Sequence, residues 1–407
     1  MASLLKWARN AVRRAPSPPM RFPISQTEVV ECLEEESNER FKTGRYYPVN
    51  IGDIFASKYQ VVGKLGFGVT STVWLARDLL EHQHVTLKIY ARNEDIENEF
   101  SIYQHLEKVK IRSWHPGADY VRGALNTFVI PRPGGDHDCL VQKPMWESWS
   151  DLLFRIPSGL FTENLLKASL KQLLLALDFL HTECKLVHTD IKGDNVLHVI
   201  NDETLLTDFV AAEMKDPSPR KIIDGMPVYA ARRFGYPKKH GIAVLSDFGS
   251  AVRGDESRNH NAGPDIYRAP EVMIKADWSY PVDIWNVGCL VWDLLEGKHM
   301  FCGQDQDGSG YRTRAHLAEI VGFLGMPPVD FLKSGLRSGD WFEEDGTWIA
   351  GIEFPQNTSL EKSEESLEEG ENKEMFMRFM RGMLQWRPED RKTAKELLED
   401  PWLNRKA

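Results

Sequence analysis

The segment that decides the fold reads Val187-His188-Thr189-Asp190-Ile191-Lys192-Gly193-Asp194-Asn195-Val196-Leu197. It sets a carboxylate, an ammonium group and an amide at the spacing Asp-x-Lys-x-x-Asn, between apolar residues. Phosphoryl transfer needs little covalent help; it needs an aligned hydroxyl, neutralised charge and a bound metal ion. Asp190 can accept the hydroxyl proton, Lys192 can hold the γ-phosphate and Asn195 can ligate Mg²⁺. The spacing favours this chemistry over a loop with no function.

A glycine-rich turn upstream is a candidate site for nucleotide phosphates. It reads Leu65-Gly66-Phe67-Gly68-Val69-Thr70-Ser71-Thr72-Val73 and lies between two strand-like runs. Glycines let backbone N–H groups approach phosphate oxygens because no Cβ stands in the way. A dinucleotide fold would need a helix after the turn. Taken alone, the turn is also compatible with a plain hairpin.

Lys88 is the candidate phosphate-binding lysine, and it follows Gly68 by 20 residues in Val85-Thr86-Leu87-Lys88. A lysine on a strand can hold two phosphates if a carboxylate fixes its ammonium group. We choose Glu99, in a helix predicted over residues 96–106, with Glu97 as the runner-up.

These motifs resemble those of eukaryotic protein kinases, and His188-Thr189-Asp190 resembles the SR-protein kinases, which phosphorylate serines in arginine–serine repeats. Three further stretches resemble the same family: residues 44–53, 71–75 and 179–182. The resemblance covers roughly residues 44–403 and implies an α+β bilobal kinase fold. In that fold a small β-rich N-lobe (59–143) and a larger helical C-lobe (147–403) flank an ATP cleft. It also implies ATP and Mg²⁺ as cofactors, with ATP held by Lys88 and residues 65–73.

Two aspartates compete for the second metal-binding position that the resemblance implies. Asp208-Phe209-Val210 lies 13 residues after Asn195, the common kinase separation, and Asp247-Phe248-Gly249 lies 52 residues after it. We choose Asp247 because the glycine of its motif is intact. It also stands 24 residues before Glu271, a plausible length for an activation segment, whereas a segment that began at Asp208 would span 63 residues. Asp208 would then lie in an insertion.

Other matches to the family are structural or mark departures. Glu271, in Ala269-Pro270-Glu271, is expected to pair with Arg391, and small-molecule kinases lack this pair. Thr189 replaces the arginine that grips a phosphorylated activation loop in many kinases, which implies activity without such phosphorylation. Gln142 and Lys143 replace the usual gatekeeper and hinge residues, so the adenine pocket departs from the pattern.

Patterning along the chain adds expectations for its organisation. Strands are predicted over 59–62, 73–76, 85–90, 127–131 and 139–142, and Thr162 is a predicted helix N-cap. Residues 1–43, basic and then acidic, are expected to be disordered. Insertions are expected near 202–240 and 356–374, with 216–236 as loop. The seven glutamates of 361–374 are expected in a solvated loop or helix end.

Composition limits the function classes. The 407 residues carry a net charge of −10, which argues against non-specific nucleic-acid binding and allows basic partners. No apolar stretch reaches membrane-spanning length. Five well-separated cysteines favour a reducing compartment. We expect a monomer in cytoplasm and nucleus, or in the mitochondrion if the basic residues 1–27 act as a presequence.

The motifs predict an ATP-dependent kinase, and the resemblance implies a serine/threonine kinase that acts on Arg/Ser-rich proteins. The alternatives are a pseudokinase scaffold that binds basic partners and a small-molecule kinase. Loss of Lys88, Asp190 or Asp247 would favour the scaffold, and all three are present.

Overall fold

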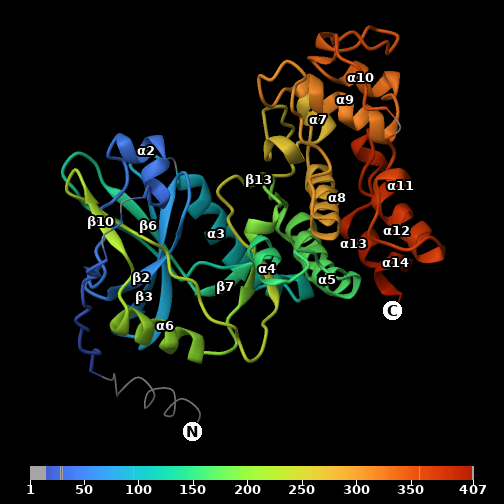
Figure 1. The fold of residues 1–407 in the computed structure, drawn as a ribbon. Helices are drawn as coiled ribbons and strands as arrows, with labels where there is room; N and C mark the ends of the chain where they lie inside the picture. The colour runs from blue at the N-terminus through green and yellow to red at the C-terminus, as the bar shows by residue number, and fades with distance from the viewer. Residues whose placement is uncertain (1–14, 28, 30, 95, 357, 406–407) are drawn as a thin grey trace. The chain divides into compact units, whose positions relative to one another are not determined.

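The computed structural model describes residues 15–27, 29, 31–94, 96–356 and 358–405 (Figure 1). Within them the chain forms two compact units. The β-rich unit consists of the described residues of Met1–Phe100, Gly123–Trp146 and Val199–Gly241. The helical unit consists of those of Ser101–Arg122, Glu147–His198 and Ile242–Ala407. A β-rich unit and a helical unit give the α+β class that the sequence predicts.

A six-stranded antiparallel sheet, in the order β1-β2-β3-β4-β6-β5, forms the frame of the β-rich unit. Its strands are β1 (Ile54–Phe55), β2 (Tyr59–Phe67), β3 (Ser71–Asp78), β4 (Gln83–Tyr90), β5 (Asn126–Ile130) and β6 (His137–Gln142). The side chains of Val85, Leu87 and Ile89 are buried, since alternate residues of a strand point to the same face. All five predicted strands are confirmed, with small differences at their ends.

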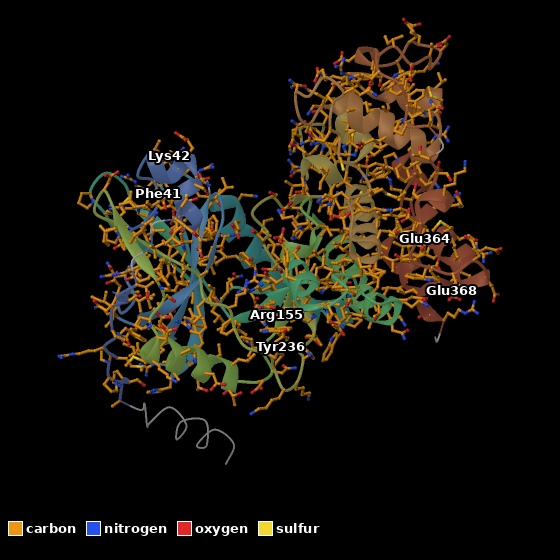
Figure 2. The ribbon with its side chains drawn as sticks, in the orientation of Figure 1. Phe41, Lys42, Arg155, Tyr236, Glu364 and Glu368 are labelled. Atoms are coloured by element: carbon orange, nitrogen blue, oxygen red, sulfur yellow. The ribbon has the colours of Figure 1, made fainter. Side chains whose placement is uncertain are left out.

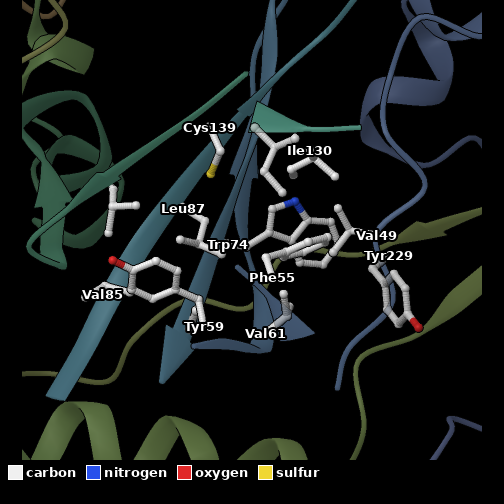
Figure 3. Close-up of a cluster of buried hydrophobic side chains, with 13 residues drawn as sticks. Val49, Phe55, Tyr59, Val61, Trp74, Val85, Leu87, Ile130, Cys139 and Tyr229 are labelled. Atoms are coloured by element: carbon white, nitrogen blue, oxygen red, sulfur yellow. The ribbon is translucent and has the colours of Figure 1, made fainter. Parts of the chain in front are cut away.

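The core of this unit is a cluster of thirteen buried side chains gathered around Trp74 (Figure 3). Val85, Leu87 and Cys139 reach it from the sheet, whereas Tyr229 comes from the predicted insertion. The ring of Tyr229 meets Trp74 edge to face, with the ring centroids 5.9 Å apart. Aromatic side chains bury large apolar areas. The insertion therefore completes the core of the β-rich unit.

The prediction of disorder is wrong for residues 31–43, which fold as a 3-10 turn (Glu34–Ser37) and the short helix α2 (Glu39–Lys42). The physical reason is Lys64 of β2, whose side chain is fully buried. Its ammonium group pairs with Glu35 and with Glu34 (2.7 Å) and donates to the carbonyl oxygen of Tyr229 (3.0 Å). A buried charge requires such partners.

Most of the predicted presequence, residues 1–14, lies outside the described residues.

The loop prediction for residues 216–236 is also wrong in part. After helix α6 (Thr204–Lys215), this segment forms a two-stranded hairpin of β10 (Arg220–Ile223) and β11 (Met226–Tyr229). Asp224 and Gly225 connect the strands with φ of 50° and 79°, and an Asp-Gly pair is a strong hairpin signal. We refer to β10 and β11 as the insertion hairpin; both belong to the β-rich unit.

Among the described residues, eleven α-helices and several short strands contribute to the helical unit. The helices are α3 (Glu97–Lys110, from Ser101), α4 (Trp149–Arg155), α5 (Glu163–Phe179), α7 (Pro270–Met273), α8 (Pro281–Glu296), α9 (Thr313–Leu324), α10 (Val329–Ser334), α11 (Leu360–Ser363), α12 (Glu371–Arg381), α13 (Ala394–Leu398) and α14 (Pro401–Asn404). The strands are β7 (Met145–Ser148), β8 (Leu186–Val187), β9 (Val196–Val199), β12 (Ala243–Leu245) and β13 (Val252–Arg253). The predicted N-cap is confirmed, since Thr162 Oγ1 accepts from the N–H of Leu165 (3.3 Å).

The acidic segment 361–374 is less solvated than its composition suggests. Glu368 is exposed, but Glu364 is buried and pairs with the Lys373 ammonium group at 3.0 Å. Both glutamates are labelled in Figure 2. Helix α12 begins at Glu371, as expected of a helix end. The prediction of a solvated segment is therefore wrong for Glu364, because a lysine within the same stretch compensates its charge on burial.

Among the described residues, no helix has the length and apolar character needed to cross a bilayer. All five cysteines are described, and none of them forms a disulfide: Cys32, Cys139, Cys184, Cys289 and Cys302.

A buried ion pair ties the start of α7 to the C-terminal part of the helical unit. Two nitrogens of Arg391 donate to the two carboxylate oxygens of Glu271 at 2.6 and 2.7 Å, which confirms the predicted pair. Both side chains are almost fully inaccessible to solvent. The nearby Arg387 makes a similar two-point contact with Asp330, but at the surface.

These two arginines allow a matched test of the buried pair. Arg391→Leu should lower the free energy of unfolding by about 3–5 kcal/mol, because it leaves the Glu271 carboxylate buried without a partner. Arg387→Leu should change it by about 0–1 kcal/mol, because its pair with Asp330 is exposed. Denaturant-induced unfolding measures both values, and equal losses for the two variants would contradict this interpretation.

Candidate active site

The catalytic loop begins after β8 and is held by one buried carboxylate. Asp283, in the first turn of α8, accepts from the N–H of His188 (2.8 Å) and of Thr189 (2.7 Å). It also accepts from Nε2 of His181 (2.9 Å). Thr189 has a φ of +69°, a region that non-glycine residues rarely adopt. The two backbone hydrogen bonds to Asp283 stabilise this strained turn. They thereby fix the path of the backbone into the next residue, Asp190.

The three residues of the Asp-x-Lys-x-x-Asn motif converge in the helical unit. The Lys192 ammonium group lies 2.9 Å from Oδ2 of Asp190. The side-chain amide of Asn195 donates to the carbonyl oxygen and to Oδ2 of Asp190, both at 2.8 Å. Because its N–H groups face Asp190, the amide oxygen of Asn195 is the atom suited to a cation. The motif thus combines a partly exposed carboxylate, a cation and an oxygen ligand.

Asp247 lies at the end of β12, which pairs with β9 directly after Asn195. The register sets Leu245 opposite Val196, and the N–H of Ser246 donates to the carbonyl oxygen of Asn195 (2.8 Å). Asp247 has a φ of +66°, and the next residue, Phe248, is fully buried. Backbone strain of this kind is often found at functional sites. The two chosen metal ligands therefore lie at the same end of two paired strands.

Asp208, the competing aspartate, lies elsewhere in the fold. It is exposed on α6 in the β-rich unit, whereas Asn195 and Asp247 belong to the helical unit. Its neighbour Phe209 is buried and would contact a Cβ placed on Gly63 at 2.7 Å. The motif Asp208-Phe209-Val210 is thus accounted for by packing of the insertion helix.

The glycine turn of the β-rich unit joins β2 to β3. Neither Gly66 nor Gly68 has a positive φ, and a Cβ on either would meet no described atom within 4 Å. Their own backbone and packing therefore do not require glycine. A ligand that approaches the backbone would require it, because a Cβ would fill the space that the ligand needs. The turn thus fits the phosphates of ATP.

Lys88 and Glu99 form the predicted ion pair, within the β-rich unit. The Lys88 ammonium group lies 3.2 and 3.5 Å from the two oxygens of the Glu99 carboxylate. Tyr90 adds a contact that we did not predict, since its hydroxyl donates to Glu99 Oε2 (2.7 Å). Tyr90 stands two residues after Lys88 on β4, so both share one face of the strand. Glu97, the runner-up, is exposed.

The buried gatekeeper position also has a polar contact. Gln142 is 2% exposed, and its side-chain amide donates to the carbonyl oxygen of Gly123 (3.2 Å). The amide is thereby held in place at a position where an apolar side chain was expected from the resemblance.

A pocket of about 460 Å³ in the helical unit includes the catalytic carboxylate. Its lining residues are Thr189, Asp190, Lys192, Ser250, His260, Asn261, Ala262, Gly263 and Pro264. The Thr189 hydroxyl donates to the carbonyl oxygen of Ser250 (2.9 Å), which fastens the activation segment to the catalytic loop. Desolvation, with Arg258 and Lys275 nearby, lowers the pKa of His260, so its imidazole is neutral at neutral pH.

Comparison with known proteins agrees with this geometry. The protein kinase domain family matches residues 59–244 and 237–403. A serine/threonine protein kinase of Aspergillus fumigatus is 43% identical over 400 residues, covering 96% of each chain. The serine/threonine-protein kinase SRPK of Physarum polycephalum is 30% identical over 395 residues, covering 91% of each. This chain belongs to the SRPK-like serine/threonine protein kinases.

A more distant relative of this kinase is SRSF protein kinase 3 of Sus scrofa, 23% identical over 520 residues, covering 91% of this chain and 90% of the relative. As a protein kinase, the chain uses ATP and a divalent metal ion. The described residues contain no group of three or more His, Cys, Asp or Glu side chains that could hold a metal ion. Asn195 and Asp247 fit a metal that takes its other ligands from phosphates and water.

Asp283→Asn should lower kcat at least about tenfold, because an amide has one acceptor oxygen and turns an N–H₂ group toward a buried donor of the loop. Such an unsatisfied buried donor costs about 1–3 kcal/mol, and 1.4 kcal/mol is tenfold. Asp277→Asn removes the same charge at an exposed position before α8 and is the control. Radiolabelled phosphate transfer measures both, and equal kcat values in the two variants would refute this role of Asp283.

Asp247→Ala should lower kcat at least about a hundredfold, since metal ions contribute several kcal/mol of charge stabilisation. Asp208→Ala should keep most of the activity, because Asp208 is exposed on α6. The same transfer assay distinguishes the two variants, and the metal dependence of nucleotide binding is a second readout. Loss of activity in Asp208→Ala but not in Asp247→Ala would assign the metal to the insertion.

Proposed function

We propose that this kinase transfers the γ-phosphate of Mg-ATP to serines flanked by arginines in Arg/Ser-rich proteins. The observation that carries the substrate class is the 30% identity, over 91% of both chains, with a kinase named SRPK. Thr189 stands where many kinases have an arginine. This replacement resembles the SR-protein kinases and supports the same substrate class. The net charge of −10 supports a basic substrate. Cytoplasm and nucleus, with the mitochondrion as the alternative, stay predictions.

In the proposed reaction Asp190 accepts the proton of the serine hydroxyl. The serine oxygen bonds to the γ-phosphorus as the bond from that phosphorus to the bridging oxygen of ADP breaks. Lys192 would neutralise charge on the γ-phosphate, and Lys88, held by Glu99, would orient the inner phosphates. Asn195 and Asp247 would hold Mg²⁺, which neutralises phosphate charge when bound.

The intact set of charged residues argues against the pseudokinase alternative. Lys88 pairs with Glu99, and Asp190 is partly exposed and lines the pocket, so none of them is replaced or sequestered. The fastening of Ser250 by Thr189 supports activity without phosphorylation of the activation segment. A neutral hydroxyl makes this contact, which needs no phosphate to form.

Selectivity for arginine must come from outside the pocket. Asp190 is the one acidic residue among the nine that line it, and in the proposed reaction its carboxylate accepts the serine proton and does not select arginine. Exposed ion pairs are worth about 0–1 kcal/mol each. Three or four flanking arginines would therefore be required for about a hundredfold preference. Serines flanked by arginine should be preferred to serines flanked by lysine, because a guanidinium group binds a carboxylate at two points.

Peptides test this proposal directly. An Arg-Ser repeat should give a kcat/KM at least about tenfold above a Lys-Ser repeat of equal charge, a difference of 1.4 kcal/mol. Raising the salt from about 0.05 to 0.2 M should lower kcat/KM more than kcat, since screening weakens exposed pairs. A Ser-Pro peptide and a generic basic protein serve as controls.

Equal rates on the Arg-Ser and Lys-Ser repeats, insensitive to salt, would contradict the substrate class while leaving the kinase activity intact. Absence of transfer to all four substrates would instead favour the scaffold alternative.

A further inference from the structure

Tyr46 lies in the β-rich unit in contact with the glycine turn. Its side-chain oxygen lies 2.7 Å from the carbonyl oxygen of Gly68 and 2.8 Å from that of Val69, so its one proton is shared between both acceptors. Tyr46 is 1% exposed. We propose that Tyr46 is a positioning residue for nucleotide binding, which holds the glycine turn with its amides directed toward the phosphates. This proposal rests on phosphate binding by that turn.

The direction of the amides follows from the geometry of the peptide bond. In a trans peptide the N–H points opposite to the preceding C=O. The carbonyls of Gly68 and Val69 point to the buried hydroxyl of Tyr46, so the N–H groups of Val69 and Thr70 point away from it. Within the described chain neither N–H donates to another backbone group outside the strands. Successive free amides of this kind form an anion-binding concavity.

Tyr46 is itself fixed by a small hydrophobic cluster. Its ring lies 6.5 Å from that of Phe41 on α2 and packs with Ala91 and with Val228 of the insertion hairpin. Figure 2 shows Phe41 on the N-terminal segment of the chain. Burial raises the pKa of Tyr46 to about 12, so the hydroxyl keeps its proton and donates throughout the neutral range.

The N-terminal segment that carries Phe41 and Tyr46 is fastened to the insertion hairpin. We call residues 31–46 the strap. Lys221 of β10 pairs with Glu36 (2.5 Å) and donates to the carbonyl oxygen of Glu31 (2.7 Å). The N–H of Ala231, just after β11, donates to Glu34. The strap, which precedes the family match at residue 59, and the insertion hairpin thus together hold the residue that contacts the glycine turn.

Tyr46→Phe tests the proposal, because it removes the hydroxyl and keeps the ring. Tyr47→Phe is the matched control, since that neighbouring ring packs on Phe55 and His137, neither of which belongs to the turn. For Tyr46→Phe we expect the Kd and KM for ATP to rise about fivefold to tenfold, the ratio that corresponds to about one hydrogen bond. The KM for a generic basic protein should stay within about twofold, the limit expected of a site that is not touched.

Hydrogen exchange gives a readout that does not depend on activity. Without nucleotide, amides of residues 64–72 should exchange faster in Tyr46→Phe than in Tyr47→Phe, because the turn loses its anchor. Phe41→Ala should produce the same change through the cluster. Unchanged ATP affinity and exchange in Tyr46→Phe, or equal changes in both tyrosine variants, would overturn the proposal. A wild-type protein that binds no ATP would instead refute the nucleotide site itself.

Discussion

The catalytic loop depends on a single carboxylate, that of Asp283. A loop that reverses direction at Thr189 with a positive φ leaves two consecutive backbone donors pointing inward, and both would be unsatisfied without it. Because Asp283 belongs to helix α8, most of whose residues are buried, the loop is anchored to a well-packed element. Asp190 and Asn195 then need few further contacts to stay in place. The geometry of the site therefore depends on a residue whose side chain is fully buried.

Much of this arrangement was predictable from the sequence, because the informative signals are local. Asp190, Lys192 and Asn195 lie within six residues, so their convergence requires only one turn of defined shape. The pairing of Lys88 with Glu99 could be anticipated because a strand and the following helix leave few candidate carboxylates. The choice between Asp247 and Asp208 needed chain lengths on both sides, since three-letter motifs recur by chance.

The parts that could not be predicted share a different property: their partners are far apart in the chain. Lys64 reads as an ordinary strand lysine until Glu35 and Tyr229 are brought to it, 29 residues before and 165 after. An acidic segment without apolar periodicity is typical of disorder, and nothing local marks it as the partner of a buried cation. The insertion hairpin is an exception, because its signal is local: the Asp224-Gly225 pair is typical of a hairpin turn, although the segment was predicted to be a loop. Tyr46 was likewise visible only as part of a matching stretch.

The burial of Lys64 determines where a stably folded kinase domain must begin in the chain. The family match begins at residue 59, which would suggest that a shortened kinase could start there. Such a protein would lack Glu34 and Glu35, and its sheet would contain an ammonium group with no anion beside it. Burying an unpaired charge is among the costliest defects in a protein interior. The folded domain therefore begins near residue 31, well ahead of residue 59, where the match to the family model begins.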